Sequence, residues 1–204
     1  MRRVRWLAAA LLLPGCALLG KSDPLVPRYF SAEYAADQGA PRAPPGLQLR
    51  LGPVQGWTHL RERMVVRRSA RELSYREDRR WTERPEIYLR RALSRSLFEE
   101  RGLVESLGGR AVTLEVELLA FEELAGPRRA RLEAHLLLRD ERLALLDGTV
   151  TVEQPAGPGD DPAQMAEAFS QALRAGVARI ADQVVERLAA RAAEPPAPGA
   201  PLRD

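Results

Sequence analysis

Three segments near the middle of the 204-residue chain alternate between apolar and polar residues with the two-residue period of a β-strand. These segments are 112–118, 132–138 and 146–152. Within each, the apolar residues share one face and the polar residues the other, which is typical of an antiparallel sheet covered on one side. The alternation slips at 118–121, where we expect a β-bulge or the end of a strand. The pattern predicts a three-stranded meander whose apolar face is buried by other elements.

Two amphipathic segments can cover that face. Their apolar or small residues recur at helical spacing: Tyr88, Leu89, Ala92, Leu93, Ser96 and Leu97 in the first, and Met165, Phe169, Leu173, Gly176, Val177, Ile180, Val184 and Leu188 in the second. Thr82 can cap the first helix, Pro85 suits its first turn and Gly102 ends it. The second helix begins with the capping residue Asp161 and extends to about Ala190. Both stripes predict helices that pack on a sheet.

Four further short strands are expected in the first half of the chain, at 28–34, 47–54, 64–66 and 72–75. Pro53 either ends the second of them or places it at an edge of the sheet, because proline cannot donate a ladder hydrogen bond. The expected fold class is therefore α+β, an antiparallel or mixed β-sheet with two main helices packed on one face.

The residue counts argue against several classes of chemistry. One cysteine and two histidines, His59 and His135, are too few for an intramolecular disulfide, a cysteine-rich zinc site or an iron–sulfur cluster. Neither a Gly-x-Ser-x-Gly elbow nor a His-Glu-x-x-His pair occurs in the sequence. We therefore expect a protein that is not an enzyme and that binds no metal and no cofactor.

The charge balance gives no sign of a nucleic-acid partner. The formal net charge is +3, and Arg2, Arg3 and Arg5 stand in an amino-terminal segment without acidic residues. Without those three, 28 basic residues face 28 acidic residues. Aromatic residues are not interleaved with the arginines as a base-stacking surface requires.

The amino terminus has the organisation of an export signal. Basic residues at 2–5 are followed by an apolar run at 6–13. That run is too short to span a bilayer, which takes roughly 20 apolar residues. We therefore expect a secretory signal.

The signal ends in Leu-Pro-Gly-Cys at 13–16, which resembles a bacterial lipobox. The resemblance implies a lipoprotein signal peptide at 1–15, acylation of Cys16 and a lipidated tether at 16–27. Because Ala17 is not an aspartate, it also implies anchoring to the outer membrane. The alternative is an ordinary signal peptide with an incidental cysteine.

The segment 74–85 is unusual because charges of alternating sign lie between two aromatic residues. We expect Tyr75 at the end of a strand and Trp81 at the start of the first helix. In one interpretation Trp81 packs the helix onto the sheet, while Arg79 or Arg80 pairs with a neighbouring acid. In the other, Tyr75, Arg79, Arg80 and Trp81 bind a partner, since tryptophan and arginine are frequent interface anchors.

Several motifs occur in a characteristic order: the lipobox-like signal, Arg-Met-Val-Val-Arg at 63–67, Glu-Leu-Ser-Tyr at 72–75, Arg-Arg-Trp at 79–81 and an amphipathic helix. In this order the chain resembles the ABC-type transport auxiliary lipoproteins, the family that includes the paraquat-inducible C lipoprotein. The resemblance extends over roughly 29–188.

This resemblance implies a periplasmic domain, which we place at 28–191, on an outer-membrane lipid anchor. Its partner would be an ABC transporter whose periplasmic subunit carries MCE domains and moves phospholipid between membranes. The lipoprotein would contact the inner leaflet of the outer membrane through its acyl chains and would hydrolyse nothing. The proline-rich segment 192–204 is expected to be a disordered tail.

A second hypothesis is a structural or regulatory lipoprotein for cell-envelope assembly, such as an activator of cell-wall synthesis. Neighbouring genes distinguish the two, because an ATPase, a permease and an MCE protein beside this gene favour transport.

Overall fold

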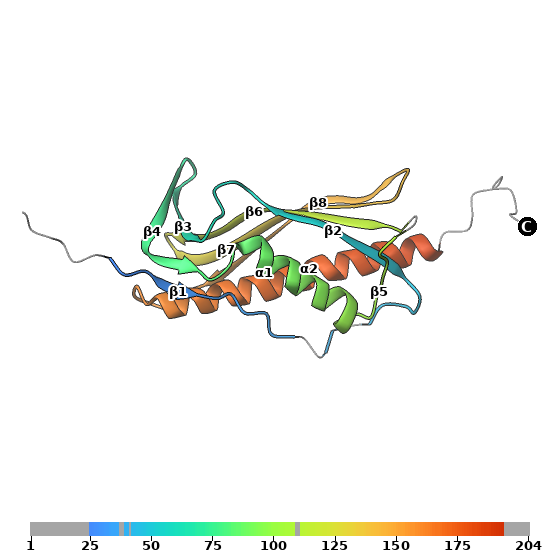
Figure 1. The fold of residues 1–204 in the computed structure, drawn as a ribbon, viewed down its shortest axis with the longest axis horizontal. Helices are drawn as coiled ribbons and strands as arrows, with labels where there is room; N and C mark the ends of the chain where they lie inside the picture. Colours follow the sequence, from blue (N-terminus) through green and yellow to red (C-terminus); the bar gives the residue numbers. More distant parts are fainter. Residues whose placement is uncertain (1–24, 37–38, 41, 109–110, 194–204) are drawn as a thin grey trace, which may run out of the picture.

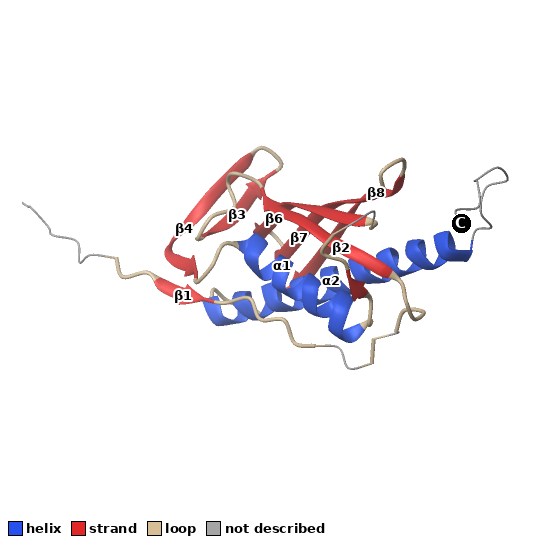
Figure 2. Ribbon diagram, turned by 45° about the vertical axis from the view of Figure 1, so that its right-hand side comes forward, coloured by secondary structure: helices blue, strands red, loops and turns tan. Residues whose placement is uncertain are grey.

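The computed structural model describes residues 25–36, 39–40, 42–108 and 111–193. Within these ranges, an eight-stranded mixed sheet is covered by helices on one face only (Figures 1 and 2). This arrangement confirms the expected α+β class with helices on one side of the sheet. Cys16 and the signal peptide lie outside the described residues.

The expected meander forms one half of the sheet. Strand β6 (Thr113–Ala125) pairs antiparallel with β7 (Arg128–Arg139), and β7 pairs antiparallel with β8 (Ala144–Pro155). The register of β6 on β7 shifts between Leu118 and Ala120, which confirms the expected bulge.

The other edge of β6 is shared by two parallel strands. β2 (Gln48–Gly56) pairs with the first half of β6 and β3 (Arg63–Ser69) with the second half. β2 continues past Pro53, and its register shifts between Leu51 and Val54. Pro53 therefore does not end the strand; the shift accommodates it without a break.

Three more strands complete the sheet. β4 (Glu72–Trp81) pairs antiparallel with β3, β1 (Arg28–Phe30) lies parallel to β4, and β5 (Val104–Glu105) lies parallel to β2. β4 runs six residues beyond Tyr75, so Tyr75 lies within the strand and not at its end. β1 is shorter than expected, and β5 was not expected from the sequence.

The first helix starts where it was expected but is capped differently. α1 (Pro85–Ser94) continues into a π-helical turn, η1 (Arg95–Glu100), and Gly102 follows with a φ of +73° that favours glycine. Thr82 does not cap α1, because it lies three residues before the helix and its hydroxyl is hydrogen-bonded to the Tyr88 hydroxyl at 2.7 Å. The side chain therefore joins the end of β4 to α1.

The second helix lies along the sheet. α2 (Pro162–Ala193) packs on β7, β8 and α1, and the Asp161 carboxylate accepts a hydrogen bond from the Ala163 N–H at 2.9 Å. A Cβ at Gly176 would lie 2.9 Å from Leu132 Cδ2, so glycine permits the close approach of α2 to β7. No helix in the described ranges is long and apolar enough to cross a membrane.

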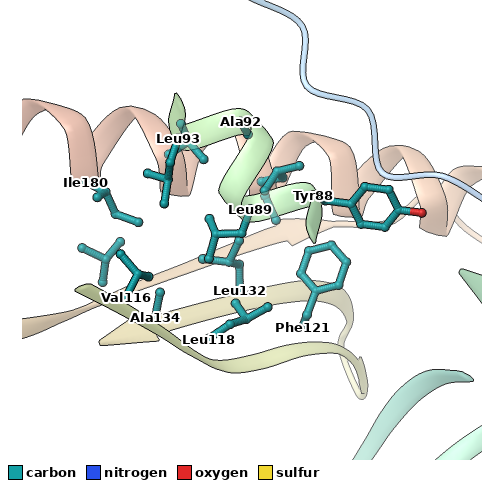
Figure 3. Close-up of a cluster of buried hydrophobic side chains, with 14 of the residues drawn as sticks. Tyr88, Leu89, Ala92, Leu93, Val116, Leu118, Phe121, Leu132, Ala134 and Ile180 are labelled. Atoms are coloured by element: carbon teal, nitrogen blue, oxygen red, sulfur yellow. The ribbon is translucent and has the colours of Figure 1, made fainter. Parts of the chain in front are cut away.

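The core lies between the helices and the inner face of the sheet (Figure 3). It contains Leu89 and Leu93 from α1, Val116, Leu118 and Phe121 from β6, Leu132 and Ala134 from β7, and Ile180 from α2. Each such leucine or phenylalanine contributes about 1.5–3 kcal/mol through burial. The opposite face of the sheet points away from both helices (Figure 2).

Candidate partner-binding surface

Four side chains gather on the outer face of the sheet, the face away from α1 and α2. They are Trp57, which follows β2, His59 in the next turn, and Leu73 and Tyr75 in β4. We call these four residues the outer patch. Trp57 is 49 % exposed, Tyr75 39 % and Leu73 36 %. The patch is therefore an apolar, aromatic surface that reaches solvent.

Trp57 is held in place through both its backbone and its ring. Its N–H donates to the Leu118 carbonyl at 3.1 Å, which continues the pairing of β2 with β6 by one residue. The indole Nε1–H donates to Glu117 Oε1 at 2.9 Å. The His59 ring meets the indole edge to face, with centroids 6.1 Å apart. The ring therefore has a fixed orientation before any partner arrives.

Tyr75 connects β4 to the same turn. Its hydroxyl donates to the His59 carbonyl at 3.5 Å, a long contact at the limit of a hydrogen bond. The register of β4 on β3 pairs Tyr75 with Val65 and Leu73 with Arg67, so both side chains point to the outer face. Strands β2 and β4, which are not adjacent in the sheet, thus contribute to one surface.

A buried carboxylate lies on the same face. Glu122 in β6 is completely buried, and it accepts a hydrogen bond from Arg67 Nε at 2.5 Å, with Arg131 Nη1 at 3.9 Å. This bond raises the pKa of Arg67 above its usual value. Burial lowers the pKa of His59, while the nearby Glu122 charge opposes that effect. The lowered pKa favours the neutral form of His59 in the outer patch, and the Arg67–Glu122 ion pair lies on the same face of the sheet.

The structure brings Arg79 into a different cluster, on the inner face at the start of α2. Its Nη2 donates to Asp160 at 2.9 Å, and its Nε lies 3.4 Å from Asp78. The buried Glu123 nearby accepts a bidentate bond from Arg76 at 2.7 and 3.0 Å. Arg79 is only 4 % exposed, so it ties β4 to the loop before α2.

Trp81 is a core residue. It is 1 % exposed, and its ring centroid lies 4.9 Å from that of Phe169, 5.2 Å from Phe121 and 6.1 Å from Tyr88. A partner cannot contact this side chain directly. The packing interpretation of the sequence therefore holds for Trp81, and the binding interpretation loses this anchor.

Of the four residues expected to bind a partner, Tyr75 and Arg80 remain accessible. Arg80 is partly exposed at the β1 end of the sheet, and its Nη1 donates to the carbonyls of Arg76 and Arg79. Tyr75 lies in the outer patch, apart from Arg80. Sequence reasoning missed Trp57, although the tripeptide Trp-Thr-His after a strand was a visible signal.

The described residues show no assembled catalytic group. His135 Nε2 lies 2.8 Å from Asp147, and within these ranges neither histidine ring is hydrogen-bonded to a hydroxyl or thiol. No cluster of three or more potential metal-ligating side chains occurs in the described part of the chain. A cavity of about 370 Å³ lies between residues 31–34 and α1, with Arg91 at its wall already bound to Glu83 at 2.7 Å. Its Tyr34 hydroxyl has a pKa raised to about 12 by burial.

Residues 31–181 match the family model of the ABC-type transport auxiliary lipoprotein component. This match covers well over half of the chain, so the chain belongs to that family. It is therefore an auxiliary lipoprotein component of an ABC-type transport system. No curated protein matches the chain in sequence.

Solved structures agree on the fold. A crystal structure of a Xanthomonas campestris protein of the family DUF330 has a TM-score of 0.68 at 19 % identity, covering 82 % of this chain and 100 % of that one. A hypothetical protein from Chlamydia trachomatis has a TM-score of 0.51 at 10 % identity, covering 70 % and 98 %. At these identities the likeness extends to the fold alone.

Proposed function

We propose that this lipoprotein is a non-catalytic docking component on the periplasmic face of the outer membrane. It is held there by acyl chains on Cys16, and its partner is the MCE-domain subunit of an ABC system that moves phospholipid between membranes. Family membership supports the transport role. The outer patch is the observation that carries the docking role.

The outer patch has the properties of an interface anchor. Tryptophan and tyrosine are enriched among the few residues that carry most of the binding energy of protein interfaces. Trp57 is fixed by a backbone bond, an indole bond and a ring contact, so little side-chain freedom is lost on binding. The ion pair between the partly exposed Arg67 and the buried Glu122 on the same face adds no net charge that a partner would have to neutralise.

The lipid anchor suits a docking component. Each buried CH₂ of an acyl chain contributes about 0.8 kcal/mol, so several chains on one residue hold a protein stably where a single chain does not. We expect the Cys16→Ser variant to incorporate no labelled fatty acid and to be lost from the outer-membrane fraction. Undiminished fatty-acid labelling of this variant would show that the lipid is carried elsewhere.

Site-specific photocrosslinking tests the docking role. A photoreactive amino acid is placed at Trp57 or at Tyr75 in cells that express the whole transport system. The control position is Leu143, a 64 % exposed apolar residue in the β7–β8 turn. We expect the MCE-domain subunit to be captured from positions 57 and 75 and not from position 143. Capture of cell-wall synthesis proteins instead would favour the envelope-assembly hypothesis.

A further inference from the structure

Exposed apolar side chains cluster where the described chain begins. Leu25 is 61 % exposed, Val26 79 % and Tyr29 64 %. They lie within the five residues 25–29, the last two of which belong to β1. None of the three is part of the hydrophobic core that the described residues form. Burial within the described fold therefore does not explain these three side chains.

Two arginines, Arg28 and Arg80, lie beside these side chains. Tyr29 is paired with Arg80 in the parallel register of β1 on β4, and Arg28 precedes it. Arg80 donates to two backbone carbonyls, and Arg28 lies over the Phe30 ring at 5.3 Å. Among the described residues, neither arginine forms an ion pair. This end of the sheet therefore combines apolar surface with uncompensated positive charge.

The same end is the one nearest to the proposed lipid anchor. Nine residue steps separate Cys16 from Leu25. A chain spans at most about 3.6 Å per residue, so Leu25 lies within about 32 Å of the acylated residue. β1 and the start of α2 share this end of the molecule, and α2 finishes at the opposite end (Figure 1).

We infer that Leu25, Val26, Arg28, Tyr29 and Arg80 form a membrane-contact surface that lies on the headgroups of an anionic phospholipid bilayer. This inference rests on the proposed acylation of Cys16, which keeps the surface close to the bilayer. Leu25 and Val26 enter the boundary between headgroups and acyl chains, where tyrosine rings also lie. Arg28 and Arg80 pair with lipid phosphates, which guanidinium groups bind in a bidentate manner.

Docking this surface fixes the direction in which the rest of the protein faces. With the β1 end on the bilayer, the far end of α2 and the β7–β8 turn point away from the membrane (Figure 2). Contact at the β1 end thus presents the sheet in a defined orientation to a partner that approaches from the periplasm.

Spin-label accessibility tests the inference on the lipidated protein purified from membranes. Val26→Cys places a label in the membrane-contact surface without removing Tyr29, and Leu143→Cys places one in the β7–β8 turn at the far end. Each protein is reconstituted in vesicles of phosphatidylethanolamine and phosphatidylglycerol. We expect the label at position 26 to collide more often with oxygen and less often with a water-soluble nickel complex than the label at position 143.

The arginines provide a second readout. Each arginine changes the ratio of membrane-docked to undocked protein about fivefold on an anionic membrane. Changing Arg28→Gln and Arg80→Gln together in the Val26→Cys protein should raise nickel accessibility in the phosphatidylglycerol vesicles. The matched control, Arg142→Gln, removes an exposed arginine at the far end and should leave accessibility at position 26 unchanged.

The outcomes separate this inference from the proposed anchor. Mass spectrometry of the amino-terminal peptide first establishes whether Cys16 is acylated. An acylated protein whose label at position 26 is as open to nickel as that at position 143 overturns the membrane contact and leaves the anchor intact. Absence of acylation overturns both. Protection from oxygen and nickel alike, persisting in detergent, shows that a second copy of the chain covers this end, and it also overturns the inference.

Discussion

Two tryptophans should respond in opposite ways to the same substitution. Trp81→Ala removes a side chain that is 1 % exposed and contacts three aromatic rings, so it should lower stability strongly. Trp57→Ala removes a side chain that is 49 % exposed, so it should lower stability little and weaken partner binding. The pair therefore separates a core residue from a surface anchor within one protein.

The magnitudes follow from the contacts. Replacing a fully buried tryptophan by alanine costs about 3–5 kcal/mol, which lowers the Tm of a domain of this size by roughly 6–20 °C. Trp57→Ala loses one exposed hydrogen bond and one edge contact with His59, together about 1 kcal/mol. As an interface anchor, however, Trp57 should be worth 2 kcal/mol or more, which is about thirtyfold in Kd.

Urea unfolding and thermal melts of both variants measure the loss of stability. Binding of the MCE-domain subunit measures the loss of affinity. We expect Trp57→Ala to fall within about 1.5 kcal/mol of the unsubstituted protein in stability while losing most of its binding. Equal destabilisation by the two substitutions, or unchanged binding by a stable Trp57→Ala protein, would refute the role of Trp57 as a surface anchor for the partner.

Two further predictions concern charged residues that join the elements. Arg101 is 2 % exposed and donates to Ser96 Oγ at 2.6 Å and to Asp182 Oδ1 at 2.7 Å, so Arg101→Met should destabilise the protein by about 2–3 kcal/mol in urea unfolding. Asp182→Asn is the control and should cost about 1 kcal/mol or less because Asp182 is largely exposed; an equal loss would contradict this account. The hydrogen bond from Arg79 lowers the pKa of the Asp160 carboxyl below the ordinary 3.8. The stabilisation by the ionised Asp160 is therefore fully present above pH 3.8 and is lost as the pH falls through the lowered pKa. Asp160→Asn should therefore be less stable than the unsubstituted protein near neutral pH and equally stable in strong acid, and a difference that persists in acid would show that its carboxylate charge is not the cause.

Hydrophobic periodicity predicted the elements that bury one face. The stripes from Tyr88 to Leu97 and from Met165 to Leu188 are the buried faces of α1, η1 and α2, and the meander is β6 to β8. These patterns are reliable because each apolar residue recurs where the element turns it toward the core. The bulge at Leu118 was visible for the same reason, as a change in the phase of the alternation.

The candidate surface was harder to predict because it depends on pairings between distant strands. Tyr75 and Trp57 share one surface only because β2 and β3 both pair with β6, and no local pattern encodes that arrangement. Trp81 was expected at a helix start because Thr82 was expected to cap that helix and Pro85 to suit its first turn. Strand β4 instead extends as far as Trp81, because β1 and β3 both pair with its charged last residues.

The most direct test of the docking proposal is the affinity between the purified lipoprotein and the MCE-domain subunit proposed as its partner. The account predicts measurable binding that falls about thirtyfold with Trp57→Ala and is unchanged with Leu143→Ala, both variants having cooperative melts. No binding by the unsubstituted protein, or equal binding by all three, would contradict the claim that the outer patch docks this partner.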